Sequence, residues 1–166
     1  MVPYMGHLLG VAAIVNDDGG SENEIIAALL HDGPEDHGGL ETLNLIRENF
    51  GDEVADIVEA LSDTFKDEKP EWKQRKVAYL RSLREKPDDE LSRKVLRVSL
   101  ADKLYNVRAI ALDWEREGDG VWARFRASRE DQLWYYESLG AIYHEKLGDS
   151  PLVRTYLSAE AALREL

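Results

Sequence analysis

The stretch Leu29-Leu30-His31-Asp32-Gly33-Pro34-Glu35-Asp36 decides how this chain folds, because an apolar run ends there in one imidazole and three carboxylates. The residues from Ile25 to Leu30 are all apolar and predict a helix packed in a core. Gly33 should end that helix, since a residue that precedes proline avoids the helical region. Polar groups at the end of a buried helix need hydrogen bonds or a metal ion, and a divalent cation is the simplest explanation.

Three separate apolar runs each carry a residue type that binds metals. His7 lies in the run Tyr4–Val15, His31-Asp32 ends the second run, and Asp102 lies in the run Val95–Val107. A His-Asp pair alone is more often a surface or capping feature, but two imidazoles and two carboxylates on three helices suit a first-row divalent ion. Manganese, iron, zinc and cobalt all tolerate this set of ligands. The chain has no cysteine, so any metal falls to imidazole and carboxylate.

Size and charge narrow the class of protein. A chain of 166 residues suits one well-buried domain, which we expect to span residues 1–166. The formal charge of −12 argues against a nucleic-acid or anionic-membrane surface. No apolar run approaches the roughly 18 residues of a membrane span, and the N-terminus lacks the pattern of a signal peptide. We therefore expect a cytoplasmic protein with no membrane partner, and the sequence leaves a homo-oligomer open.

The apolar spacing predicts helices throughout and no sheet. Ser21 to Glu24 should open a helix as a capping box, Gly51 and Asp52 should cap adjoining helices, and Ser150-Pro151 should open the last helix. A polar linker is expected from Lys66 to Glu71, and the aromatic residues after position 120 are assigned to the core. The expected helices cover residues 4–15, 22–32, 40–50, 54–61, 72–84, 93–108, 121–126, 128–147 and 151–166.

Basic residues cluster in two of these segments. Ten of the 21 lysines and arginines lie between Trp72 and Arg84 or between Arg93 and Arg108. In so acidic a chain, this clustering suggests a positive face that receives a polyphosphate beside the proposed metal. For any single lysine or arginine, an ordinary solvated helix face is the simpler interpretation.

The candidate ligands also carry a family resemblance. His7, His31-Asp32 and Asp102 resemble the H…HD…D signature of the HD-domain metal phosphohydrolases. Three longer segments resemble the hydrolase domain of the RelA/SpoT alarmone enzymes and their small free-standing relatives: Pro3-Tyr4-x-x-His7, His31-Asp32-x-x-Glu35-Asp36 and Ala101-Asp102-Lys103-Leu104-x-Asn106. This resemblance implies an all-α fold, a single HD-domain helical bundle.

The resemblance further implies a manganese-dependent hydrolase of the stringent response that acts on a nucleotide. It would cleave the 3′-pyrophosphate of the alarmone (p)ppGpp and release pyrophosphate and GDP or GTP. The implied roles are metal binding by His7, His31, Asp32 and Asp102, activation of water by Glu35 and Asp36, and substrate binding by Asn106. Lys103 and Arg108 from the basic clusters are further candidates for substrate binding, although they point to other faces of the helix than Asp102 and Asn106. Spacing alone would also allow the two acids after Pro34 to cap a helix, and the amide to lie on a helix surface.

The chain departs from the family pattern at three places. The family has a helix with basic residues before the Pro-Tyr-x-x-His segment, whereas this sequence starts at Met1, so we expect a late annotated start, a partner chain over the gap, or an impaired domain. Gly33-Pro34 replaces small and apolar residues, and Ala109 or Ile110 stands where a hydroxyl is frequent. Nothing corresponds to a synthetase domain. The alternatives are therefore an HD phosphohydrolase for another nucleotide or phosphoester, and an HD module that binds without turnover.

Overall fold

The computed structural model describes residues 4–62 and 70–166. Within these residues the chain forms nine α-helices, one 3₁₀-helix and no strand, which confirms the predicted all-α class. The elements are α1 Tyr4–Asp17, α2 Glu22–Leu30, α3 Gly33–Asp36, α4 Leu40–Phe50, α5 Asp52–Leu61, α6 Trp72–Arg84, α7 Glu90–Glu117, η1 Gly118–Arg124, α8 Arg129–Leu147 and α9 Pro151–Glu165.

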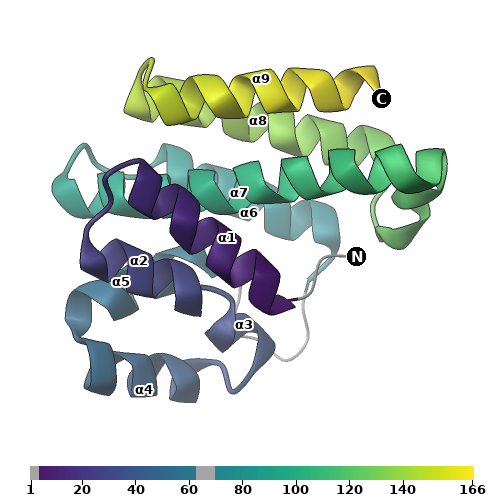
Figure 1. The fold of residues 1–166 in the computed structure, drawn as a ribbon. Helices are drawn as coiled ribbons and strands as arrows, with labels where there is room; N and C mark the ends of the chain where they lie inside the picture. The colour runs from purple at the N-terminus through teal and green to yellow at the C-terminus, as the bar shows by residue number, and fades with distance from the viewer. Residues whose placement is uncertain (1–3, 63–69) are drawn as a thin grey trace.

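The long helix α7 runs through the middle of the bundle and separates two groups of helices (Figure 1). On one side it contacts α1, α2 and α5, with α4 packed on α5, and on the other it contacts α8 and α9, with α6 packed on α8. The buried apolar residues form two cores, one on each side of α7. Val98 and Ala101 belong to the core shared with α1, α2, α4 and α5, whereas Leu100 and Leu104 belong to the core shared with α6, α8 and α9. Because apolar residues cover two faces of α7, a polar residue between them, Asp102, is carried into the interior, where only 6% of it is exposed.

Several predicted helix ends are confirmed. Ser21 and Glu24 form the reciprocal capping box at the start of α2, and Ser150 caps α9 with proline in its first turn. Gly51 ends α4 with φ of 89°, a conformation that glycine adopts without strain. The prediction that Asp52 caps α5 is wrong, because Gly51 also occupies that cap position and Asp52 is the first helical residue.

Other boundaries differ from the prediction. The helix expected over 93–108 extends over Glu90–Glu117, and the helix expected over 121–126 is the 3₁₀-helix Gly118–Arg124. Gly33-Pro34 ends α2 as expected, but it also begins the single turn α3, which the sequence analysis did not predict. Proline favours the first turn of a helix because its fixed φ is helical and its missing N–H is not needed there.

Two expectations fall on residues that the structure does not describe. Pro3, and the polar linker from Lys66 as far as residue 69, lie outside the described ranges. Along residues 4–62 and 70–166, we find no helix that combines the length and the apolar character required to cross a membrane.

Candidate metal centre

The His31-Asp32 pair occupies the sharp junction between α2 and α3. The Nδ1 atom of His31 lies 2.7 Å from the carbonyl oxygen of Ala28, one of the oxygens that the last turn of a helix leaves without a backbone partner. Donation of the Nδ1 proton to this oxygen turns the other ring nitrogen, Nε2, away from α2. Asp32 follows at the N-cap of α3, so its carboxylate lies beside that nitrogen.

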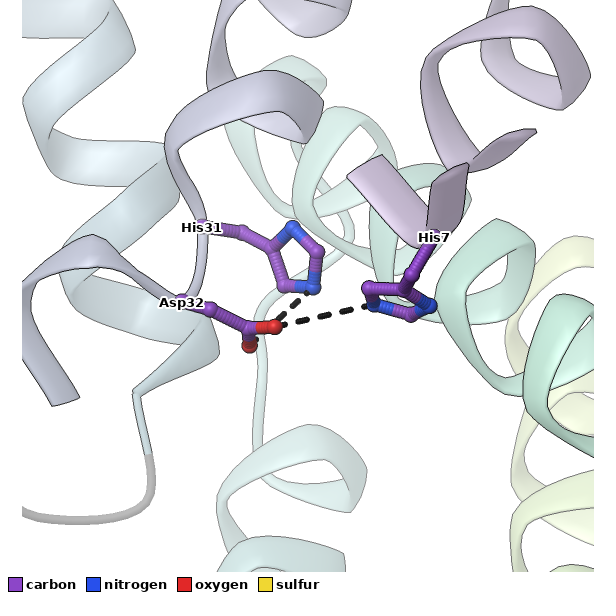
Figure 2. A group of neighbouring side chains, drawn as sticks. All are labelled: His7, His31 and Asp32. Atoms are coloured by element: carbon purple, nitrogen blue, oxygen red, sulfur yellow. Dashed lines mark ion pairs between the residues drawn. The ribbon is translucent and has the colours of Figure 1, made fainter. Parts of the chain in front are cut away.

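The four predicted ligands lie together although they come from three parts of the chain. His7, His31 and Asp32 each offer a ligand atom, and these atoms all lie within 4.8 Å of one another (Figure 2). His31 Nε2 is 3.2 Å from Asp32 Oδ1, and His7 Nε2 is 3.6 Å from Asp32 Oδ2. Asp102 Oδ1 is 3.4 Å from His7 Nε2 and 3.7 Å from His31 Nε2.

The donor set fits a divalent cation. His31 Nε2 is buried and, among the described residues, has no hydrogen-bond partner. A buried polar atom without a partner costs free energy, and here the ring nitrogen faces carboxylate oxygens that also carry lone pairs. A cation between them would satisfy all of these atoms, and imidazole with carboxylate is a common set for zinc, manganese and iron. Metal binding by these four residues stays a prediction that the geometry supports.

Asp102 is held by two neighbours on α7. Its Oδ2 atom accepts a hydrogen bond from Lys103 Nζ at 2.5 Å, and its Oδ1 atom accepts one from Asn106 Nδ2 at 2.8 Å. Burial acts to raise the pKa of Asp102, but the charges of Lys103 and His31 outweigh it and hold that pKa well below its usual range. The carboxylate is therefore charged, and Oδ1 is the oxygen that faces the imidazoles.

Burial and neighbouring charges shift the pKa values of the other three candidate ligands. Burial lowers the pKa of His7 and raises that of Asp32. Burial also acts against the charged form of His31, but Asp102 and Asp32 outweigh it and raise the pKa of His31 to about 9. Without a metal, these two carboxylates thus hold a proton on His31, and a metal ion at this place would compete with that proton.

The site opens into a cavity of about 330 Å³. The four candidate ligands line it together with Glu35, Leu61, Arg75, Lys76, Lys103 and Asn106. Of the two predicted catalytic acids, Glu35 lines this cavity, whereas Asp36 is exposed and lies near Tyr4. Burial, Asp32 and Asp36 together raise the pKa of Tyr4 to about 12, so its phenol is a hydrogen-bond donor at neutral pH.

Arg108, a predicted substrate-binding residue, lies away from this cavity. It lines a separate hollow beside α9 together with Asp17, Asp18 and Thr155. Six residues along an α-helix correspond to a rotation of about 240°, so Arg108 and Asp102 face different sides of α7. This position removes the support for a direct contact between Arg108 and a substrate at the cavity.

The predicted positive face is smaller than the sequence suggests. Arg93 pairs with Asp88, Lys94 with Glu53 and Glu90, and Arg97 with Asp18 and Glu24. Of the ten clustered basic residues, those that line the cavity are Arg75, Lys76 and Lys103. The cationic surface beside the candidate metal ligands therefore comes from α6 and from the middle of α7.

A second cavity adjoins the first, and the sequence did not predict it because most of its lining residues are of the apolar and aromatic types that form cores. It measures about 370 Å³, shares Lys76, Lys103 and Asn106 with the first, and is lined further by Trp72, Ala109, Ile110, Asp113, Val121, Arg124, Phe125, Gln132, Tyr135 and Tyr136. The prediction that the aromatic residues after position 120 belong to the core is confirmed for Tyr135 and Tyr136, which line this cavity from the core side. The sequence feature that could have indicated this cavity is Lys76, a charged residue that lies one turn after Trp72 on the same helix face.

A helical bundle that gathers imidazoles and carboxylates from several helices at one point belongs to a class of proteins with a metal site between helices. The chain belongs to the HD-domain family, because its residues 1–133 match the family model described as HD domain. This match confirms the resemblance inferred from the sequence.

Proteins similar to this chain include two pyrophosphohydrolases and a pyrophosphokinase. The chain is 38% identical over 108 residues to guanosine-3′,5′-bis(diphosphate) 3′-pyrophosphohydrolase MESH1 of Xenopus tropicalis, which covers 64% of this chain and 55% of the relative. The MESH1 protein of Homo sapiens is 36% identical with the same coverage. GTP pyrophosphokinase rsh of Brucella abortus is 36% identical over 66% of this chain and 14% of the relative. The chain thus spans about half the length of the MESH1 relatives it matches.

A solved structure shares the whole fold. The crystal structure of lmo0812 from Listeria monocytogenes EGD-e superimposes with a TM-score of 0.80 and 27% sequence identity. The match covers 96% of this chain and 99% of that one, so α8 and α9, which lie mostly beyond the matched family segment, belong to a fold that occurs elsewhere.

Proposed function

We propose that this protein is a metal-dependent phosphohydrolase that removes the 3′-pyrophosphate of (p)ppGpp and yields pyrophosphate and GDP or GTP. The observation that carries the proposal is the meeting of His7, His31, Asp32 and Asp102 at one cavity, which basic side chains also line. The names of the MESH1 relatives supply the substrate class. Membership of the HD-domain family supports the reaction type.

The four ligands would hold a divalent cation, for which we propose Mn²⁺, while Fe, Zn or Co also suit the set. When bound, such an ion polarises a phosphoryl oxygen and lowers the pKa of water. Glu35 lines the cavity and would accept the proton of the attacking water. Asp36 does not line the cavity and would act on the same water network from its rim.

In the reaction, a water oxygen forms a bond to the phosphorus that is attached to the 3′ oxygen. The bond between this phosphorus and the 3′ oxygen breaks. The 3′ oxygen leaves with a proton as a hydroxyl group, and pyrophosphate carries the new oxygen. Arg75, Lys76 and Lys103 line the cavity, and their positive charges would offset the charge of the pyrophosphate. Lys103 is anchored by Asp102, so its ammonium is fixed in place before the substrate arrives.

The second cavity suits the nucleoside part of the substrate. Asn106 and Lys103 stand at the border of the two cavities, and Trp72, Phe125 and Tyr135 offer aromatic surface for a base. A nucleotide could therefore place its 3′-pyrophosphate at the metal ligands and its base among aromatic side chains.

The test is hydrolysis of ppGpp by purified protein loaded with Mn²⁺. The expected products are pyrophosphate and GDP, separated by ion-exchange chromatography, and His31→Gln should abolish their release. Arg108→Gln is the matched control, because this side chain lies at a separate hollow. Metal-loaded, folded protein that releases no pyrophosphate would overturn the assignment of the substrate.

One observation favours a different nucleotide as a second candidate. Ala109 or Ile110 stands at the position where the alarmone enzymes often carry a hydroxyl, and both line the second cavity without a side-chain hydrogen bond to offer to a base or ribose. A panel of nucleotides and phosphoesters would separate the two candidates. Binding of ppGpp without turnover would instead support a module that only binds.

We also propose that residues 1–166 form one domain. The packing of α8 and α9 on α7, and their shared apolar core, support this proposal. Cytoplasmic localisation and a homo-oligomer stay predictions of the sequence.

A further inference from the structure

Gly10 lies in the interior of α1, where glycine is less favourable than alanine. Its backbone conformation is the ordinary one, so the helix does not require glycine for its geometry. Space is the requirement: a Cβ atom built on Gly10 would lie 2.1 Å from Cε2 and 2.5 Å from Cδ2 of the Tyr105 ring. The absence of a side chain at Gly10 therefore leaves the space that the Tyr105 ring occupies.

The same ring contacts a candidate ligand. The rings of Tyr105 and His7 meet edge to face, with centroids 5.1 Å apart and an interplanar angle of 73°. Gly10 is three residues after His7 on α1, and Tyr105 is three residues after Asp102 on α7. Residues three apart on a helix are neighbours, so this contact joins the two helical turns that carry these ligands.

This contact restricts the imidazole on one side. His7 is largely buried, with 15% of its side chain exposed, and its Nε2 atom faces Asp32 and Asp102. The hydrogen bond from Nδ1 to Ala28 fixes the ring of His31, whereas for His7 the ring contacts are with Tyr105 and His31. Edge-to-face packing of aromatic rings fixes orientation as well as position.

We propose that Tyr105, packed against Gly10, is a positioning residue that keeps the His7 imidazole oriented toward the other three candidate ligands. The inference rests on the metal centre of the proposed function. It assigns to Tyr105 a role that depends on the ring and not on the hydroxyl. It also explains why a helix-weakening glycine stands one turn from a ligand.

The first test measures the ring of His7 without metal. The chain has four histidines, so His7→Gln identifies the NMR signal of the His7 Cε1 proton. In chelator-treated protein, Tyr105→Leu should shift and broaden this signal, because the aromatic neighbour is lost, while Tyr105→Phe should leave it sharp. An unchanged His7 signal in the leucine variant would overturn the inference.

The second test measures the affinity for Mn²⁺ by the EPR signal of the free ion. Tyr105→Leu and Gly10→Ala should each weaken binding about 10-fold to 100-fold, the usual effect of removing a residue that orients a metal ligand. Tyr105→Phe should restore wild-type affinity. Gly120→Ala is the matched control, since a Cβ atom there meets nothing within 4 Å.

The double variant separates positioning from a general loss of structure. If Gly10→Ala acts by displacing the ring, it should weaken binding no further once Tyr105→Leu is present. Additive losses, or equal Mn²⁺ affinity in wild type and in folded Tyr105→Leu, would overturn the inference alone. Wild-type protein that binds no Mn²⁺ would overturn the proposed metal centre, and the NMR test would still decide whether Tyr105 holds His7.

Discussion

Replacing Asp102 with alanine should lower the free energy of unfolding of the metal-free protein by about 3–5 kcal/mol, the usual cost of breaking a buried ion pair from one side. The structure explains why the cost is high. Lys103 Nζ lies 2.5 Å from Asp102 Oδ2, and its side chain is 16% exposed. The substitution leaves this ammonium buried without its carboxylate, and Asn106 also loses its acceptor.

Urea unfolding followed by circular dichroism, in the presence of a chelator, measures this loss. Lys103→Met should also destabilise the protein, because it leaves the Asp102 charge buried. The double variant Asp102→Ala/Lys103→Met removes both charges, so it should lose less stability than the sum of the two single variants. A loss below about 1 kcal/mol for Asp102→Ala, as expected of an exposed pair, would refute the assignment of a buried ion pair at this ligand.

Three further outcomes are expected. Glu35→Gln should lower the rate of ppGpp hydrolysis by about 10²–10⁴ and leave Mn²⁺ affinity intact; loss of affinity would make Glu35 a ligand. In chelator, the stability that protonated His31 contributes is complete below pH 6.5 and is lost as pH rises through about 9; urea midpoints of wild type and His31→Gln should therefore converge across this range, and a constant difference would contradict the shift. Lys76→Met should raise the KM for ppGpp, whereas Arg108→Gln should not, and equal KM values for both variants would count against the cavity as the substrate site.

The close approach of the four candidate ligands could be predicted because each lies within an apolar run or at its end. A polar residue within such a run is carried into the core by its neighbours, as Ala101 and Leu104 carry Asp102. Helix geometry alone places Arg108 on another side of α7 from Asp102, but the sequence could not show the hollow beside α9 that this side chain lines. The sequence also could not tell which clustered basic residues are paired, since Arg97 finds its partners in Asp18 and Glu24, more than 70 residues away.

The fold class and most helix cores follow from apolar spacing. The C-terminal extension of α7 also carried a signal that the prediction did not use, because apolar residues continue from Ala109 to Trp114 and end only before Gly118. The ion pair between Asp113 and Arg124 ties η1 to α7, and the sequence alone does not show this contact. The start of α7 did carry a signal, because Asp89 caps it by accepting a hydrogen bond from the Ser92 backbone N–H.

Metal analysis of protein purified without chelator tests the central claim most directly. We predict about one divalent ion per chain in the wild type and its loss in His31→Gln, whose side chain lacks the imidazole nitrogen that faces Asp32 and Asp102. Wild-type protein without a divalent ion even after incubation with Mn²⁺, or a His31→Gln variant that retains the full metal content, would contradict it.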